Sequence, residues 1–94
     1  MTAKSKRSAC IVGAGGGIGR ATTALLAAQG YGPLICLDLA GSDVDAVAAE
    51  HGATALHIDL RDPASVPAVF AKAREITPNL DVLVLVSGVV ENKH

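Results

Sequence analysis

Apolar runs of strand length alternate along the chain with alanine-rich stretches of helical length. The runs cover residues 8–13, 33–39, 55–60 and 80–87. An alternation of this kind is typical of strand–helix units repeated around a parallel sheet. The pattern therefore predicts an α/β fold with four strands.

Three stretches between these runs carry the signals of helices. The first is expected over residues 18–29, with Gly30 in the left-handed conformation that ends it. The second begins at residue 42 or 43 and closes on Gly52, and the third follows Pro63, because proline is favoured in the first helical turn. The residues predicted to face the sheet are Ala21, Ala24, Leu25 and Ala28 in the first helix, Val44, Val47 and Ala48 in the second, and Val66, Val69, Phe70 and Ala73 in the third.

Crossover connections between parallel strands are right-handed in almost all proteins, and this restricts the order of the strands. The simplest arrangement is a Rossmann-like, three-layer αβα fold whose parallel sheet has the order 3-2-1-4. The first two helices then cover one face of the sheet and the third covers the other. Because the direction of strand travel reverses between the first and fourth strands, a crevice forms at their carboxyl ends, where open α/β sheets bind ligands.

The segment GAGGGIG, residues 13–19, joins the first strand to the first helix and contains five glycines. Its backbone N–H groups and the positive end of the helix converge on one spot, which predicts an anion site. The spacing excludes both the ordinary dinucleotide pattern G-x-G-x-x-G and a P-loop, and fits G-x-x-x-G-x-G at Gly13, Gly17 and Gly19. Glycine at these positions permits a sharp turn, lets a diphosphate approach the backbone, and lets the helix pack close to the strand. The alternative is a tight strand-to-helix turn that binds nothing.

Asp38 ends the second apolar run, 19 residues after Gly19. A carboxylate about 20 residues beyond the glycines accepts hydrogen bonds from the adenosine ribose hydroxyls of a dinucleotide. A carboxylate in that place repels a 2′-phosphate, so we expect NAD in preference to NADP. The alternative is an exposed aspartate that caps a loop.

Length and charge limit the classes of function. At 94 residues, 50% of them hydrophobic, the chain has room for one domain. A formal net charge of −1 argues against nucleic acid as a partner, and the basic residues near the start lie in a segment, 1–7, that we expect to be flexible. No apolar stretch reaches the length of about 18 residues that a membrane span needs, so we expect no membrane contact.

Cys10 and Cys36 lie in apolar runs and are expected to be buried reduced thiols. Reduced thiols are typical of a reducing compartment, so we expect a cytoplasmic protein.

Several of these segments together resemble the short-chain dehydrogenase/reductase family over nearly the whole chain. The segment VGAGGGIG is similar to the family's glycine motif, and DVLVLVSG is similar to its fourth strand. Asp38 corresponds to the family's acidic ribose contact, and Asp59 with Leu60 corresponds to its pair beside the adenine ring. The resemblance implies a dinucleotide cofactor bound at Gly13, Gly15, Gly16, Gly17, Ile18, Gly19, Asp38, Leu39, Asp59, Leu60, Ser87 and Gly88.

The chain departs from the family pattern in two respects. Leu85 and Val86 stand where the family carries paired asparagines, which help to knit the central sheet and to position backbone against the cofactor. The family's catalytic serine and Tyr-x-x-x-Lys pair lie beyond the last residue, so we assign no catalytic residue. Tyr31, the only tyrosine, is expected at the end of the sheet opposite the crevice. His57 and Asp59 point to one face of the third strand without a third ligand, so we expect no metal site.

These features predict an NAD(P)-binding Rossmann half-domain over residues 8–90 and a truncated tail at 91–94. We interpret the chain as the cofactor-binding part of an oxidoreductase that transfers hydride between NAD and an alcohol or ketone, inactive by itself. The alternative is a non-catalytic nucleotide-binding module or a degenerate remnant. Residues 82–86 are apolar on both faces and only one of these faces is expected beneath the third helix, so we also expect self-association through the fourth strand.

Overall fold

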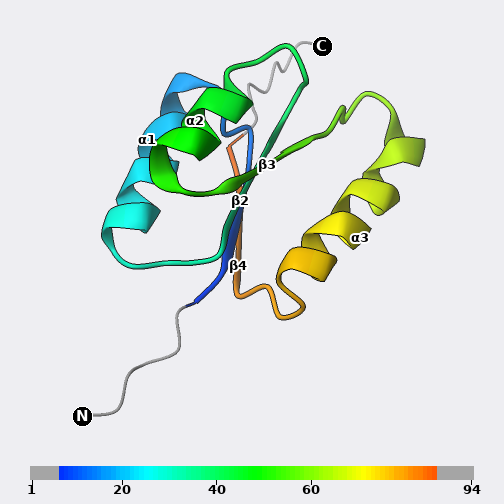
Figure 1. The fold of residues 1–94 in the computed structure, drawn as a ribbon. Helices are drawn as coiled ribbons and strands as arrows, with labels where there is room; N and C mark the ends of the chain where they lie inside the picture. The colour runs from blue at the N-terminus through cyan, green and yellow to red at the C-terminus, as the bar shows by residue number, and fades with distance from the viewer. Residues whose placement is uncertain (1–6, 87–94) are drawn as a thin grey trace.

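The computed structural model describes residues 7–86, which form one parallel sheet with helices on both faces (Figure 1). The strands are β1 (Ala9–Val12), β2 (Leu34–Asp38), β3 (Thr54–His57) and β4 (Val82–Leu85), and the helices are α1 (Gly17–Ala28), α2 (Val44–His51) and α3 (Val66–Ile76). The sheet order is β3-β2-β1-β4, with every neighbouring pair parallel, which confirms the predicted Rossmann-like arrangement. The domain limits predicted at residues 8 and 90 stay a prediction, and residues 87–94 lie outside the described part.

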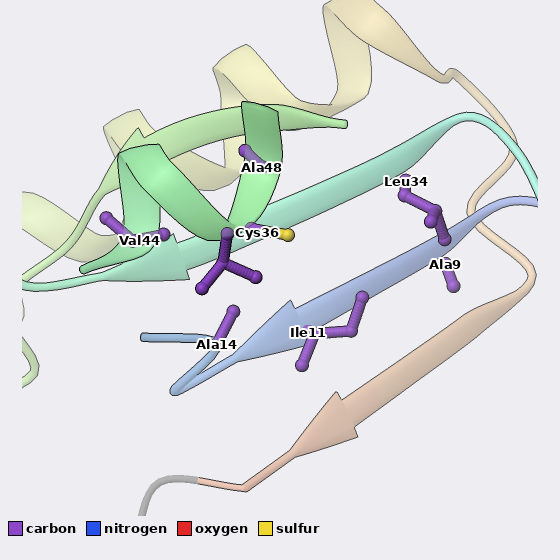
Figure 2. Packing of buried hydrophobic residues seen from close by; sticks show 8 residues of the cluster. Ala9, Ile11, Ala14, Leu34, Cys36, Val44 and Ala48 are labelled. Carbon is purple, nitrogen blue, oxygen red and sulfur yellow. The ribbon is translucent and has the colours of Figure 1, made fainter. Parts of the chain in front are cut away.

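The face of the sheet beneath α1 and α2 carries the first of two apolar clusters (Figure 2). Side chains of parallel strands alternate between the two faces, so β1 and β2 each contribute every second residue to it. Its buried members are Ala9, Ile11, Ala14, Leu34, Cys36, Val44, Val47 and Ala48. The predicted inward face of α2 is thereby confirmed.

The second cluster lies on the opposite face, beneath α3, which Figure 1 shows on the far side of the sheet from α1 and α2. Its buried members are Cys10, Val12, Ile35, Leu37, Ile58 and Ala73. Val66, Val69 and Phe70 pack against it half-buried, so the predicted stripe of α3 is confirmed. The two helical layers enclose β1 and β2, whose residues 9–12 and 34–37 are all buried.

The buried face of α1 differs from the prediction. Leu25, which was expected to face the sheet, is 57% exposed, and Ala21 and Ala28 are exposed as well. The residues that face the sheet are Gly19, Thr23, Leu26 and Ala27. Close packing of Gly19 on the loop fixes the rotation of the helix, and Thr23, one turn later, donates its hydroxyl to the Gly19 carbonyl at 2.8 Å. An alanine-rich sequence left several rotations of nearly equal hydrophobicity, so the pattern alone did not choose among them.

β4 also has its covered face on the side opposite to the one predicted. Val82, Val84 and Val86 pack against the cluster beneath α1 and α2. Leu83 and Leu85 point to the face of α3 and are 49% and 69% exposed. The prediction that α3 covers β4 is therefore wrong, because α3 packs over β3 at the other edge of the sheet.

The ends of the helices follow the predicted signals except at α3. Gly30 and Gly52 have φ of +88° and +66°, the left-handed conformation expected after α1 and α2. Pro63 does not begin α3 but a separate 3₁₀ turn, η1 (Pro63–Ser65), and α3 follows with its own proline in the first turn. None of the helices in residues 7–86 has the length and hydrophobicity that crossing a membrane requires.

Cys10 and Cys36 are free and buried, as predicted. They lie on adjacent strands but in opposite clusters, so their side chains point to opposite faces of the sheet. Burial raises the pKa of the Cys10 thiol to about 12, an effect to which the charge of Cys36 adds. Burial also raises the pKa of Cys36, against a hydrogen bond with Thr23 that lowers it. Both thiols are therefore protonated near neutral pH and belong to the core.

Candidate functional site

The loop that joins β1 to α1 turns sharply at the carboxyl end of the sheet. Gly13 has φ of +94°, a conformation that favours glycine, and its N–H donates to the carbonyl of Leu37 at 2.7 Å. A Cβ atom on Gly19 would lie 2.0 Å from the carbonyl oxygen of Gly13, closer than non-bonded atoms can approach. The sharp turn and the close packing of helix on strand expected for these two glycines are both present.

The amino-terminal end of α1 has open space in front of it. Gly16 is the N-cap, no side chain caps the helix, and the first turn contains no acidic residue. The first N–H groups of a helix have no acceptor within the helix, and the helix dipole adds positive partial charge there. A Cβ atom on Gly17 would meet no other atom within 4 Å, and Ile18 is 74% exposed. This end of α1 therefore offers N–H donors and unobstructed space to an anion.

Asp38, the last residue of β2, lies beside the same loop. Its Oδ2 atom accepts the N–H of Gly15 at 2.8 Å, and its Oδ1 atom accepts the N–H of Leu39 at 2.8 Å. A Cβ atom on Gly15 would lie 2.7 Å from Oγ of Ser42 and 3.0 Å from Oδ2 of Asp38. Glycine at position 15 therefore lets the carboxylate at the end of β2 contact the loop directly.

A cavity of about 220 Å³ lies between the end of β1, the end of β2 and the segment that follows β3. Its walls are mostly aliphatic: Ile58 is buried, whereas Leu39 and Leu60 are 41% and 51% exposed. The full lining consists of Val12, Gly13, Asp38, Leu39, Ile58, Asp59, Leu60 and Arg61. The cavity thus combines apolar surface with the carboxylates of Asp38 and Asp59.

Asp59 lies in a turn rather than in a strand, because β3 ends at His57 and not at residue 60 as predicted. Its Oδ1 atom accepts hydrogen bonds from the backbone N–H and from Nε of Arg61, both at 2.9 Å, and its Oδ2 atom accepts Nη2 of Arg61 at 3.1 Å. These hydrogen bonds lower the pKa of the Asp59 carboxyl and raise that of the Arg61 guanidinium. The pair is therefore ionised at neutral pH.

A larger cavity, of about 760 Å³, adjoins the first and shares four lining residues with it: Leu39, Ile58, Asp59 and Arg61. It extends past Ser42 and His57 toward Ser65, between the ends of β2 and β3 and the start of α3. Nε2 of His57 lies 3.1 Å from Oδ2 of Asp45, which connects the end of β3 to α2. The crevice at the carboxyl ends of the strands therefore continues from the smaller cavity toward the start of α3.

The predicted binding residues within the described part all lie near the carboxyl ends of β1, β2 and β3. They are Gly13, Gly15, Gly16, Gly17, Ile18, Gly19, Asp38, Leu39, Asp59 and Leu60. Ser87 and Gly88 lie outside the described residues. Arg61, which the prediction did not include, lines both cavities and donates to Asp59; the sequence DLRD places this arginine two residues after Asp59, within reach of its carboxylate across a turn.

The other candidates lie apart from one another. His57 pairs with Asp45 and not with Asp59, which is held by Arg61. Among residues 7–86 there is no group of three or more His, Cys, Asp or Glu side chains that could hold a metal ion. Tyr31 lies between the end of α1 and the start of β2, at the end of the sheet opposite the crevice, as predicted. Its N–H donates to the carbonyl of Leu26 at 3.0 Å, and its side chain packs against the cluster beneath α1 and α2.

Comparisons with solved structures agree with this fold. A protein from Brucella melitensis 16M described as a ribose-5-phosphate isomerase matches with a TM-score of 0.82 and 35% identity over 90% of this chain and 33% of its own. A protein from Sinorhizobium meliloti 1021 described as a short-chain dehydrogenase/reductase matches with a TM-score of 0.80 and 26% identity over 95% of this chain and 43% of its own. A protein described as a 3-oxoacyl-reductase from Bacillus thuringiensis, at 19% identity and a TM-score of 0.76, covers 94% of this chain and 39% of its own, and shows the fold alone.

Sequence comparisons identify the family. The oxidoreductase UcpA of Salmonella typhimurium and that of Salmonella typhi are each 38% identical to this chain in an alignment 88 positions long, which covers 88% of this chain and 33% of the relative. The chain thus spans about a third of the length of these relatives. The family model for short chain dehydrogenase matches residues 7–94. The chain therefore belongs to the short-chain dehydrogenase/reductase family.

Proposed function

We propose that the carboxyl edge of the sheet binds NAD, and that the chain is the cofactor-binding part of an oxidoreductase that transfers hydride between NAD and an alcohol or ketone. The observation that carries this proposal is the placement of the uncapped end of α1 and the Asp38 carboxylate next to one aliphatic cavity. Along its adenosine half, a dinucleotide carries a diphosphate, then ribose hydroxyls, then the flat adenine ring. Each of the three finds a partner of matching chemistry at this edge.

The acceptor capacity of Asp38 supports the ribose contact. A carboxylate has about four lone-pair positions, two on each oxygen. Gly15 uses one position on Oδ2 and Leu39 uses one on Oδ1, which leaves one on each oxygen. Two neighbouring ribose hydroxyls can donate to these two positions without displacing either backbone N–H. The carboxylate has no proton to offer a 2′-phosphate and would repel it, so NAD is the preferred form in this proposal.

Bound NAD supplies the hydride acceptor, and the protein must supply an acid or base for the alcohol or carbonyl oxygen. The only tyrosine, Tyr31, is followed four residues later by Ile35 and lies near the start of β2, away from the crevice. We therefore propose that these 94 residues bind the cofactor and do not turn over substrate by themselves. A cytoplasmic location, expected from the sequence, is part of the same proposal.

A second candidate, a nucleotide-binding module without redox activity, shares the site and differs only in turnover. An assay with NAD and a panel of secondary alcohols and ketones, read at the NADH absorbance, gives background rates in both cases for this chain. The same assay on a longer protein, encoded by a reading frame that continues past His94 and carries the family's serine and Tyr-x-x-x-Lys, would give turnover only if the oxidoreductase assignment is correct.

Gly17→Ala tests the diphosphate contact. We expect the affinity for NAD and for ADP-ribose to fall about tenfold or more, because the added Cβ occupies the open space in front of α1 that the diphosphate needs. The free energy of unfolding should stay equal or rise by up to about 1 kcal/mol, since alanine favours a helix more than glycine does. Calorimetric titration and chemical unfolding measure the two quantities.

Ala21→Ser is the matched control, because it adds one atom at an exposed position of the same helix. It should leave the affinity unchanged. Wild-type affinity in Gly17→Ala would contradict the placement of the diphosphate, and absence of any dinucleotide binding by the wild-type chain would contradict the proposed function as a whole.

A further inference from the structure

β3 forms an outer edge of the sheet, and part of its backbone has no strand to bond to. It pairs with β2 on one side, and within residues 7–86 no strand lies along the other. The N–H of Ile58 donates to the carbonyl of Asp38 at 2.9 Å, so the even-numbered residues of this segment bond toward β2. A strand directs the N–H and C=O of successive residues to opposite sides, so those of Ala55 and His57 point outward. These two residues offer donors and acceptors at the spacing of a strand ladder.

A cavity of about 330 Å³ lies between this edge of β3 and α3. It is lined by Ala55, Leu56 and His57 of β3 and by Ala68, Val69 and Lys72 of α3. Leu56 and Val69 are half-buried and leave aliphatic surface toward it. The ring of His57 is bonded on the side of α2, where its Nε2 atom lies 3.1 Å from Oδ2 of Asp45. The cavity therefore places aliphatic side chains next to the outward backbone groups of β3.

The charge at this cavity is positive. Lys72 supplies the only permanent charge among the described lining residues, and its ammonium forms no ion pair within residues 7–86. None of those lining residues is acidic, whereas the cavities of about 220 and 760 Å³ both contain Asp59. An aliphatic surface beside an unpaired ammonium is complementary to a ligand that carries an apolar group and a carboxylate.

We propose that the outer edge of β3 and the side of α3 that faces it bind an extended acidic peptide of another protein, which adds to the four-stranded sheet as a further strand. The peptide backbone bonds to Ala55 and His57, and an aliphatic side chain enters the cavity. A carboxylate two residues along the peptide contacts Lys72, because alternate side chains of a strand lie on the same face.

Two observations define the partner and the independence of this site. A second copy of β3 (TALH) would bring no carboxylate to Lys72, so the partner is a different polypeptide. The cavity shares no lining residue with the cavity of about 220 Å³ beside Asp38. The inference therefore does not rest on the proposed binding of NAD.

The test is an NMR titration of the isotope-labelled chain with the probe peptide acetyl-Thr-Glu-Thr-Val-Thr-Glu-Thr-amide. In a strand, the valine and both glutamates of the probe lie on one face, so a glutamate reaches Lys72 in either strand direction. We expect saturable shifts centred on the backbone N–H signals of Ala55 and His57. A probe with glutamine in place of both glutamates should bind about two- to fivefold more weakly, the range for an exposed ion pair.

A third probe tests the strand ladder. It carries N-methyl groups on the valine and on the threonine that follows it. One of these two neighbouring N–H groups faces β3 in either register, so this probe should not bind.

Variants of Lys72 separate its charge from the backbone contact. Lys72→Gln should bind the glutamate and glutamine probes equally, because the ion pair is absent from both complexes. Lys72→Glu should reverse the preference, toward a probe with lysine in place of both glutamates. Lys72 is exposed, so both variants should keep the denaturation midpoint of the wild-type chain. Arg74→Gln removes a positive charge from the same helix at a position that does not line the cavity, and should leave all affinities unchanged.

Four outcomes would contradict the proposal. The glutamate probe could cause no saturable shifts at Ala55 and His57, or the N-methylated probe could bind as well as the unmodified one. Equal affinities of the wild-type chain for the glutamate and glutamine probes would remove the role of Lys72. Shifts of the same signals that depend on chain concentration without any probe would make a second copy of the chain the occupant of this edge.

Discussion

The two strands that flank β1 have similar sequences and different surroundings. β2 (LICLD) and β4 (VLVL) are both apolar and both pair with β1 in parallel register. β2 is buried on both faces, because α2 and α3 contribute to the clusters on either side of it. β4 is covered on one face only, and its leucines are exposed on the other. An apolar run therefore identifies a strand of a parallel sheet but not the elements that cover it.

The register makes this comparison direct at the level of single residues. Val12 of β1 is aligned with Leu37 on one side and Leu85 on the other, and Cys10 is aligned with Ile35 and Leu83 in the same way. All four flanking residues point to the face of α3. Leu37 and Ile35 are fully buried, whereas Leu85 and Leu83 are 69% and 49% exposed. Leu37 and Leu85 therefore form a first pair for comparison, and Ile35 and Leu83 a second. The same replacement residue at both members of a pair measures how far β2 and β4 are each covered on the face of α3.

The largest difference is expected for lysine at the first pair. Leu37→Lys places an unpaired charge in the core and should unfold the chain, because the cost of burying it, about 5 kcal/mol or more, is comparable with the total stability of a small domain. Leu85→Lys should change the free energy of unfolding by about 0.5 kcal/mol or less. Circular dichroism during chemical denaturation measures both. Unfolding of Leu85→Lys would show that β4 is covered on that face in solution.

The same variant tests the self-association through β4 that the sequence predicts, which stays a prediction. The exposed leucines lie in β4, which pairs with β1 along one edge and, within residues 7–86, has no strand along the other. If copies associate there, sedimentation velocity of the wild-type chain should show concentration-dependent species that Leu85→Lys reduces, because a charge at an open edge opposes pairing. A wild-type chain that sediments as a folded monomer at high concentration would contradict the prediction.

A smaller difference is expected for alanine at the second pair. Ile35→Ala should lower the free energy of unfolding by about 2–5 kcal/mol, because it leaves a cavity between β2 and α3. Leu83→Ala should lower it by about 1 kcal/mol or less, since half of that side chain is already in contact with water. Denaturation midpoints at equal slopes give both values. Equal losses at the two positions would contradict the difference in burial.

The sequence predicted the sheet order and the two-sided layering because these follow from alternating periods and from the handedness of crossovers. It predicted the positions of Asp38 and the glycine loop because these depend on local chain geometry next to β1 and β2. It failed at the rotation of α1 and at the covered face of β4. Those features depend on a close contact at Gly19 and on the lateral position of α3, which no periodicity records.

Within the candidate site, the sequence predicted where Asp38 lies but did not predict the side-chain partner of Asp59. The neighbours of Asp38 are backbone N–H groups of Gly15 and Leu39, which its place at the end of β2 brings near. The partner of Asp59 is the side chain of Arg61, which curls back across a turn that was predicted to be strand. A shorter strand than expected therefore created a contact that the apolar pattern did not indicate.

The most direct test of NAD binding with its ribose on Asp38 is a calorimetric titration of Asp38→Ala with NAD and with NADP, with Asp43→Ala as the control. Asp43 is an exposed carboxylate at the start of α2 that makes no capping hydrogen bond. The wild-type chain should bind NAD more tightly than NADP. Asp38→Ala should weaken NAD binding by about ten- to hundredfold and change NADP binding little, because it removes hydrogen bonds from one ligand and a repulsion from the other. Tighter binding of NADP by the wild-type chain, or an equal loss of affinity for both cofactors in Asp38→Ala, would contradict the proposed contact between Asp38 and the ribose of NAD.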